Sequence, residues 1–312
     1  MGNLLKANGI KIWFEEFGES SNETILLIMG ANANCKQWPQ EFIDELVSKD
    51  FRVIRFDNRD VGKSSWIGKE PTYNKFLKIL PAFFLKIIVN RIFGLAIDKK
   101  GKFKFSKSAV VQYDLSDMAK DAVSLMDSLN IEKAHIVGAS MGGMITQIIA
   151  LDYPERVKSI TPIMTTPGIQ NESLSGPSQE LLNAMQKSFV MNLKGRVEDG
   201  VVEIYKQLTG SRFPFDEQDF RNKLAPIVEH GNNPFALHGA AIGASPDRTS
   251  RLNEINVPTL VIHGTEDAIL PLDHGIALAD GIKNSTRMIM DRVGHEIPEQ
   301  LYSEIVNAIV EN

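Results

Sequence analysis

The sequence feature that most constrains the fold is a glycine-rich turn, Gly138-Ala139-Ser140-Met141-Gly142, between two apolar segments. The run 134–137 before it is typical of a buried strand, and residues 144–151 after it have helical spacing. In such a strand–G-x-S-x-G–helix context the serine stands at a helix N-terminus with its oxygen clear of the sheet. The pentapeptide alone fits an incidental serine in a glycine-rich turn equally well, so the rest of the chain must decide.

Composition sets wide limits on the remaining possibilities. The chain has 312 residues, 43% of them hydrophobic, and a net charge of −5. This length allows two domains or one large α/β domain with an insertion, and the charge gives no basis for binding nucleic acid. The single cysteine, Cys35, excludes an intrachain disulfide framework and fits a cytoplasmic location. We expect no signal peptide, because the first residues lack its apolar core.

Strand and helix patterns alternate along most of the chain, which predicts an α/β fold with a mostly parallel central sheet flanked by helices. The predicted strands are runs of apolar or alternating residues at 10–14, 24–29, 51–56, 134–137, 157–164, 257–264 and 286–290. The predicted helices of this core have apolar residues at helical spacing and lie at 39–47, 115–129, 144–151, 273–279 and 298–310.

An insertion at 71–105 interrupts this alternation. It is apolar and aromatic between residues 76 and 93 but carries scattered lysine and arginine. These basic residues and Pro81 argue against a transmembrane span, which needs about 20 mostly apolar residues. Three interpretations stay open: a helical lid over the serine, an amphipathic helix on a membrane surface, and an insertion that packs on its own domain.

A second interruption, at 168–256, shows helical patterns but no strand pattern. Its predicted helices lie at 179–193, 197–208, 216–228 and 234–242. A helical block between two strands predicts a cap over one edge of the sheet, inserted before the next-to-last strand. The expected organisation is therefore a core in two parts, residues 1–167 and 257–312, with the cap between them.

A nucleophilic serine needs a base to accept its proton, and chain position favours His295 among the six histidines. His295 follows the last predicted strand, at the carboxyl edge where sites of parallel sheets form and where Ser140 also lies. His135 begins the strand before the turn, on the opposite edge, and is expected to be structural. The remaining four fit the role less well: His230 and His238 lie in the cap and could at most touch substrate, His263 ends a strand, and His274 begins a helix.

The base needs an acidic partner to orient it, and the loop after the next-to-last strand offers two. Asp267 is the first choice and Glu266 the reserve. An exposed Glu-Asp turn without a catalytic role stays open, because Asp is common in turns.

A developing oxyanion needs hydrogen-bond donors. The backbone N–H of Met141, directly after the serine, is one candidate, and that of Ala31 in the small-residue stretch 30–34 is the other. We expect no metal site, because no His-x-x-x-His or Cys/His cluster is present in the sequence. Both glycine-rich phosphate motifs are also missing, so no cofactor is expected.

Four motifs in order resemble those of α/β-hydrolase-fold enzymes over nearly the whole chain. They are residues 57–64, the G-x-S-x-G turn, residues 258–264 leading to Asp267, and Gly294-His295. The chain order Ser140, Asp267, His295 is the order of catalytic serine, acid and histidine in that fold.

Within this fold, residues 29–32 and 140–152 resemble the aclacinomycin methylesterase-like carboxylesterases. The resemblance implies a triad of Ser140, Asp267 and His295, with Ala31 and Met141 as oxyanion donors. The insertion at 71–105 departs from that group.

The interpretation that combines these features is a serine hydrolase that cleaves a small-molecule carboxylic ester through an acyl-enzyme. Serine at the turn excludes relatives that use aspartate there, such as epoxide hydrolases, whereas haloperoxidases, C–C bond hydrolases and thioesterases stay open. Two further alternatives remain. One is a lipase or monoacylglycerol-type hydrolase that contacts a membrane surface through residues 76–93, and the other is a non-enzymatic ligand-binding protein.

Overall fold

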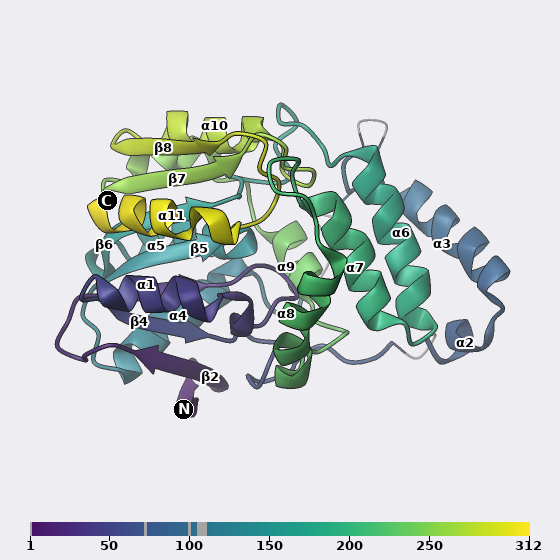
Figure 1. The fold of residues 1–312 in the computed structure, drawn as a ribbon, viewed down its shortest axis with the longest axis horizontal. Helices are drawn as coiled ribbons and strands as arrows, with labels where there is room; N and C mark the ends of the chain where they lie inside the picture. Colours follow the sequence, from purple (N-terminus) through teal and green to yellow (C-terminus); the bar gives the residue numbers. More distant parts are fainter. Residues whose placement is uncertain (1, 72–73, 99–100, 105–110) are drawn as a thin grey trace.

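The computed structural model describes residues 2–71, 74–98, 101–104 and 111–312. Its centre is an eight-stranded sheet with the strand order β1-β2-β4-β3-β5-β6-β7-β8 (Figure 1). β2 runs antiparallel to its two neighbours, and the pairs from β4 to β8 are parallel. The predicted α/β class with a mostly parallel sheet is therefore confirmed. The strands are β1 (Asn3–Ala7), β2 (Ile10–Phe17), β3 (Thr24–Ile28), β4 (Arg52–Phe56), β5 (Ala134–Ala139), β6 (Val157–Ile163), β7 (Thr259–Gly264) and β8 (Ser285–Met290).

Two helical layers cover the sheet, and β3 shows why its sequence is continuously apolar. All five residues of β3 are buried. Leu26 and Ile28 pack in the core on one face, whereas Ile25 and Leu27 pack in the core on the other. A parallel strand covered on both faces needs apolar residues at successive positions. The helices of the first face are α4 (Leu115–Ser128), α5 (Met141–Asp152) and α10 (Leu272–Gly281), and those of the second are α1 (Gln40–Ser48) and α11 (Tyr302–Glu311).

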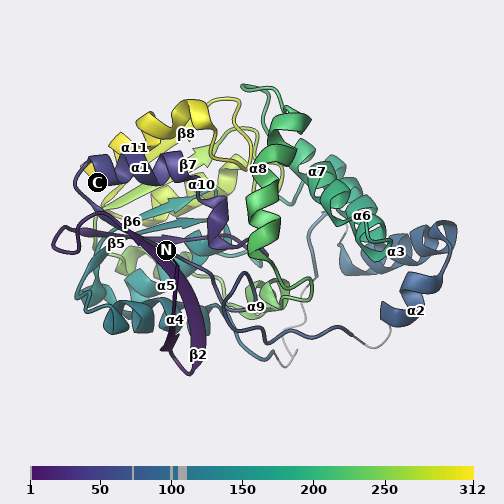
Figure 2. The same cartoon turned by 60° about the horizontal axis from the view of Figure 1, so that its bottom comes forward.

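The segment between β6 and β7 forms helices α6 (Gln179–Leu193), α7 (Val197–Leu208), α8 (Glu217–His230) and α9 (His238–Ala244). The 71–105 insertion forms α2 (Asn74–Ile79) and α3 (Ala82–Ala96), while its residues 72–73, 99–100 and 105 lie outside the described residues. Both helices pack on α6, and both views place them beyond it, at the end of the molecule away from the sheet (Figures 1 and 2). The insertion thus extends the helical layer over the carboxyl edge instead of packing on the core.

The turn from β5 into α5 depends on close backbone approach. A Cβ on Gly138 would lie 2.3 Å from the Gly142 carbonyl oxygen, and one on Gly142 would lie 2.0 Å from the Ile28 carbonyl oxygen. Since real Cβ atoms do not come within these distances of backbone, glycine is required at both positions. This packing sets the first turn of α5 directly against the end of β3.

We predict that Gly142→Ala lowers the free energy of unfolding by about 2–3 kcal/mol, because the added methyl group overpacks a rigid backbone contact. Gly239→Ala is the matched control. Gly239 lies in α9 with open space around the position of a Cβ, so alanine is expected to be neutral or to stabilise by up to about 1 kcal/mol. Urea denaturation measures both, and equal stability of the two variants would contradict the packing account.

Candidate active site

Ser140 sits between β5 and α5 in a backbone conformation that non-glycine residues rarely adopt, with φ 54° and ψ −117°. Such strain costs about 1–3 kcal/mol and persists only where the surroundings hold it. Here the Ser140 N–H donates to the Ile163 carbonyl oxygen at 2.9 Å, and the Ser140 carbonyl oxygen accepts from Thr165 Oγ1 at 2.7 Å. Contacts to the end of β6 and the residues after it therefore fix the serine backbone, while its side chain is left for other partners.

Asp267 and His295 lie in the loops after β7 and β8 and form a hydrogen-bonded pair. His295 Nδ1 lies 2.7 Å from Asp267 Oδ2. The other carboxylate oxygen, Oδ1, accepts from the backbone N–H groups of Ile269 and Leu270 at 3.0 and 2.8 Å. Burial alone would raise the pKa of Asp267, but His295 and these donors outweigh it and lower the pKa. The carboxylate is therefore charged and fixes the Nδ1–H tautomer of His295, which leaves Nε2 as an acceptor.

Ser140 and His295 share the carboxyl edge of the sheet, but no hydrogen bond joins their side chains in the described structure. The side chain of His295 is 9% exposed. Catalytic hydrogen bonds are often loose without substrate and tighten only in the reacting complex. The serine–histidine contact is thus the one link of the expected triad that the structure leaves open.

The stretch after β3 lies beside the serine. A Cβ on Gly30 would lie 3.8 Å from Ser140 Oγ, which places the next residue, Ala31, at the same turn. Neither the Ala31 N–H nor the Met141 N–H donates to another of the described residues. Both donors are therefore available to an oxygen atom bound at Ser140, as an oxyanion hole requires.

His238 of α9 holds this stretch in place, a role that sequence reasoning missed. Its Nδ1 accepts from the Asn32 N–H at 2.8 Å, and its Nε2 donates to the Arg59 carbonyl oxygen at 2.7 Å. Burial lowers the pKa of His238, which keeps the ring neutral and so preserves the acceptor at Nδ1. A cap residue thus fixes the backbone next to Ala31.

The cap also holds the loop that carries His295. The His295 N–H donates to the Leu208 carbonyl oxygen at 2.7 Å, at the end of α7. Glu266, the reserve acid, accepts from the backbone N–H and the hydroxyl of Ser211 at 2.7 and 2.9 Å. Of the two acidic candidates, the structure brings Asp267 to His295 and uses Glu266 to fasten the cap.

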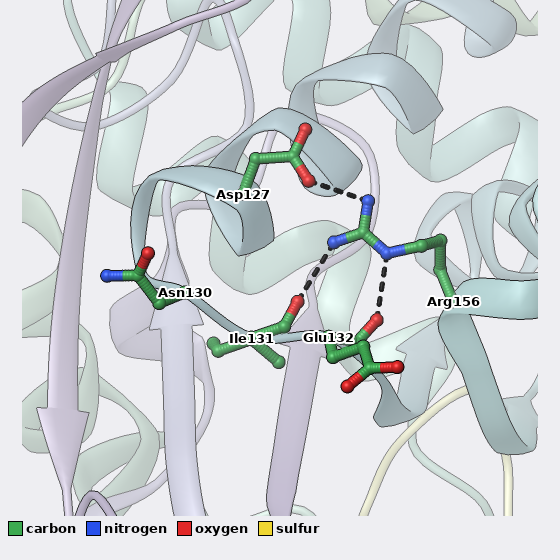
Figure 3. Close-up of a pocket in the computed structure, with 5 residues that line it drawn as sticks. All are labelled: Asp127, Asn130, Ile131, Glu132 and Arg156. Atoms are coloured by element: carbon green, nitrogen blue, oxygen red, sulfur yellow. Dashed lines mark hydrogen bonds and ion pairs between the residues drawn. The ribbon is translucent and has the colours of Figure 1, made fainter.

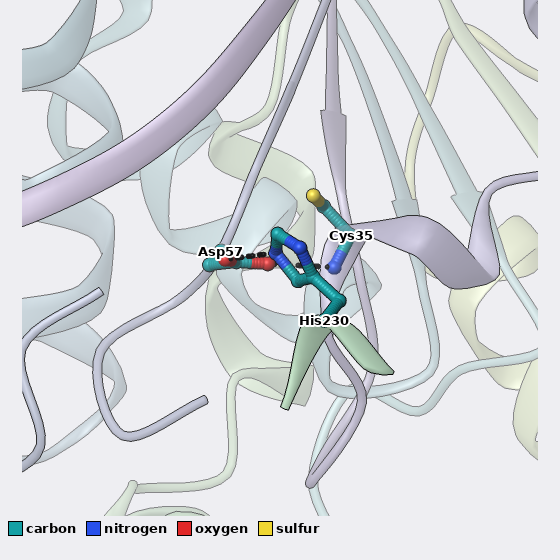
Figure 4. A group of neighbouring side chains, drawn as sticks. All are labelled: Cys35, Asp57 and His230. Atoms are coloured by element: carbon teal, nitrogen blue, oxygen red, sulfur yellow. Dashed lines mark hydrogen bonds and ion pairs between the residues drawn. The ribbon is translucent and has the colours of Figure 1, made fainter. Parts of the chain in front are cut away.

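The cluster of Cys35, Asp57 and His230 is a second group that the sequence did not reveal (Figure 4). Its possible metal-ligand atoms lie within 4.8 Å of one another. The Asp57 oxygens are already engaged: Oδ1 accepts from the Cys35 N–H at 2.9 Å, and Oδ2 accepts from the Lys63 N–H at 2.8 Å and lies 2.7 Å from His230 Nε2. Burial and the nearby Asp57 raise the pKa of the Cys35 thiol, so it stays protonated and is a poor ligand. These contacts fasten α8 to the loops after β3 and β4.

The other histidines are engaged in structural contacts. His135 Nδ1 lies 2.8 Å from Ser159 Oγ at the amino end of β5, as expected for a structural residue. His263 Nε2 donates to the Leu270 carbonyl oxygen at 2.7 Å, close behind Asp267. His274 Nε2 donates to the Ser175 carbonyl oxygen at 2.9 Å.

A surface hollow at the opposite edge of the sheet is not a second site of this kind (Figure 3). It lies before β5 and β6, where Arg156 is surrounded by Asp127, Asn130, Ile131 and Glu132. The guanidinium pairs with Asp127 at 2.6 Å and donates to the carbonyl oxygens of Ile131 and Glu132 at 2.9 and 2.8 Å. Since its donors are taken by protein acceptors, Arg156 ties two loops together.

Comparison with known proteins identifies the family of this fold. A family profile described as alpha/beta hydrolase fold matches residues 23–200. The chain therefore belongs to the α/β hydrolase fold family. Because relatives that align over more than 90% of it are named methylesterases and hydrolases, the chain is a hydrolase, and the non-enzymatic interpretation is set aside.

Three relatives illustrate the similarity. A rhodomycin D methylesterase from Streptomyces peucetius is 26% identical over an alignment of 329 positions, which covers 98% of this chain and 96% of that protein. A 2-hydroxy-6-oxononadienedioate/2-hydroxy-6-oxononatrienedioate hydrolase from Paraburkholderia phymatum is 33% identical over an alignment of 297 positions, which covers 92% of this chain and 85% of that protein. The solved enol-lactonase from Burkholderia xenovorans superposes with a TM-score of 0.70 at 17% identity and covers 99% of this chain and 100% of its own. The predicted resemblance to methylesterases is thereby confirmed.

We predict that Asp267→Asn lowers the free energy of unfolding by about 1–3 kcal/mol at pH 7, because it removes a charged partner of buried groups. The pKa of Asp267 is lowered in the folded chain, so its stabilising effect is present above about pH 4 and is lost as the pH falls through the folded-state value. The difference between wild type and variant should therefore shrink below about pH 4. Glu266→Gln, at an exposed position, should lower the free energy of unfolding by less. If both variants lose the same stability, or if the difference for Asp267→Asn does not change with pH, Asp267 is not the charged partner of His295.

Proposed function

We propose that this chain hydrolyses a small-molecule carboxylic ester, with Ser140 as nucleophile, His295 as base and Asp267 as the residue that orients the base. The observation that carries the proposal is the convergence of the strained Ser140 turn and the Asp267–His295 pair on one edge of the sheet. A cytoplasmic location is part of the proposal, because the one cysteine of the chain is buried and unpaired.

In the proposed reaction the Ser140 hydroxyl attacks the ester carbonyl while His295 Nε2 accepts its proton. The reaction requires the two side chains to rotate until Ser140 Oγ lies within hydrogen-bond distance of His295 Nε2. Asp267 stabilises the imidazolium that forms, and the N–H groups of Ala31 and Met141 donate to the tetrahedral oxyanion. His295 then gives the proton to the alkoxide as the alcohol leaves. In the second half His295 Nε2 takes a proton from a water molecule, whose oxygen bonds to the acyl carbonyl carbon; the bond from that carbon to Ser140 Oγ breaks, His295 returns the proton to Oγ, and the acid is released.

An ester is favoured over other substrates of serine enzymes because two relatives that align over 98% of this chain are named methylesterases. The Paraburkholderia phymatum relative is named for a substrate that has a ketone and no ester. Hydrolysis of a C–C bond next to a ketone is therefore the main alternative to ester hydrolysis. The donors beside Ser140 suit any acyl transfer, so the distinction lies in the substrate and not in the triad.

We predict that wild type hydrolyses short p-nitrophenyl esters and that Ser140→Ala reduces kcat by about 10⁴-fold or more, because it removes the nucleophile. Ser250→Ala, an exposed serine outside the site, is the control and should keep wild-type activity. A panel of esters, thioesters and a vinylogous diketone, followed spectrophotometrically, separates the chemistries. Ester turnover by the Ser140→Ala protein, or cleavage of the diketone alone by wild type, would overturn the proposal.

We also predict that His238→Ala lowers kcat by about tenfold or more with little change in KM, since a fully lost oxyanion donor costs ~10²–10³ in rate. The matched control is His230→Ala, which removes another buried cap histidine bonded to a core loop. Both variants should lose stability, whereas only His238→Ala should lose kcat. Equal kcat values in the two folded variants would show that His238 has no role in positioning Ala31.

A further inference from the structure

Exposed large apolar side chains gather on one part of the described surface. Six of them lie on α2 and α3: Ile79, Phe83, Phe84, Ile87, Ile92 and Leu95, which we call the apolar patch. The others lie singly on different elements: Leu4 on β1 and Val228 on α8, for example, and Phe189 on α6, the helix on which α3 packs. Single exposed apolar residues need no explanation, but a contiguous group of this kind marks an interaction surface.

Helix α3 is apolar on both its inner and its outer side. Leu85 and Val89 are buried on the side that packs on α6. On the opposite side, Phe83 and Ile87 are 69% and 52% exposed. A helix that only covers a cap carries polar residues toward water. The outer side of α3 therefore needs a second apolar environment, and in both views no helix or strand of the described residues lies beyond it (Figures 1 and 2).

The charge of this segment identifies that environment. Residues 71–97 contain four basic residues and no Asp or Glu, in a chain whose net charge is −5. Lys78 pairs with Glu70 at 2.6 Å, whereas Lys86 and Arg91 of α3 are exposed and have no acidic partner among the described residues. An apolar helix face flanked by unpaired cations complements an anionic lipid surface. A two-fold pairing of this face with itself in a second copy would bring like charges together.

We propose that α2 and α3 dock this enzyme on an anionic phospholipid surface. The apolar patch enters the acyl boundary, and Lys86 and Arg91 lie among the headgroups. The helices lie on the bilayer, since none in the described residues is long and apolar enough to cross it.

Docking has a consequence for the choice of substrate. This part of the inference rests on the proposed ester hydrolysis. The insertion is fastened to the cap by Lys194 Nζ, which donates to the Lys78 carbonyl oxygen at 3.1 Å, and by Lys102 Nζ, which donates to the Asn171 carbonyl oxygen at 2.8 Å. A bilayer bound at α3 is therefore next to the cap. We infer that the substrate is an amphiphilic ester that partitions into lipid.

The test is sedimentation of the full-length protein with vesicles of phosphatidylcholine, with and without phosphatidylglycerol. Wild type should bind the anionic vesicles and bind neutral ones at least tenfold more weakly. Lys86→Gln/Arg91→Gln should weaken anionic binding about 25-fold, because each basic residue near the surface contributes a factor of about five. Phe83→Ser/Ile87→Ser should weaken it tenfold or more.

Matched controls change the same residue types elsewhere. Leu4→Ser/Val228→Ser removes exposed apolar side chains from β1 and α8. Lys6→Gln/Lys133→Gln removes exposed positive charges on β1 and directly before β5. Both should bind as wild type does. All variants should keep wild-type turnover of a short water-soluble ester. Lys86→Gln/Arg91→Gln and Phe83→Ser/Ile87→Ser, which we call the α3 variants, should lose turnover of a long-chain ester carried in anionic vesicles.

Three results would overturn docking: wild type does not bind anionic vesicles, wild type binds neutral vesicles equally well, or both α3 variants bind anionic vesicles as wild type does. A concentration-dependent dimer that Phe83→Ser/Ile87→Ser dissociates would assign the patch to a second copy instead. Failure of the proposed ester hydrolysis can be told apart from failure of docking, because vesicle binding does not depend on the nucleophile and Ser140→Ala should still bind vesicles. Vesicle binding without turnover of any ester would reject that proposal and leave docking standing.

Discussion

The rest of the site depends on one backbone constraint, the positive φ angle of Ser140 directly after β5. It is held by a hydrogen bond to Ile163 on one side and by the tight approach of Gly142 to the end of β3 on the other. Together these contacts bring the ends of β3, β5 and β6 to the same point. The proposed nucleophile Ser140 and the candidate oxyanion donors lie side by side because these strand ends are locked together, whereas His295 reaches the same edge from the loop after β8.

The cap does more than cover this edge. Through His238 it fixes the backbone next to Ala31, and through the carbonyl of Leu208 it fixes the loop of His295. Glu266 and the Asp57 cluster add further attachments between cap and core. Since both halves of the proposed machinery are held partly from the cap, changes in cap helices should affect the chemistry as well as the choice of substrate.

The sequence predicted the regular elements well because their periodicity is local. The helices at 179–193 and 197–208 have the predicted bounds, and the buried strands lie within a residue or two of theirs. β1 was missed because its residues are mostly exposed and show no clear apolar alternation. α8 was predicted to end at 228 but continues to His230, past Pro226. The C-terminal end of α8 is set by the contact of His230 with Asp57 of the core, and the local sequence pattern does not show this contact.

The candidate site was predictable to the extent that it follows from strand ends. Ser140, Asp267 and His295 each follow a parallel strand, and this rule alone brings them to one edge. The roles of His238 and His230 were not predictable, because their partners Asn32 and Asp57 lie 206 and 173 residues away in the chain. Such contacts depend on how the cap docks, which no local pattern encodes.

The central claim is that Ser140 forms a covalent acyl-enzyme. Intact-protein mass spectrometry after rapid acid quenching of an ester reaction tests it most directly, followed by peptide mapping of the adduct. The account predicts a single added acyl group on the peptide that contains Ser140, and its absence in Ser140→Ala. An adduct on another residue, or steady turnover of the ester with no adduct at any quench time, would contradict it.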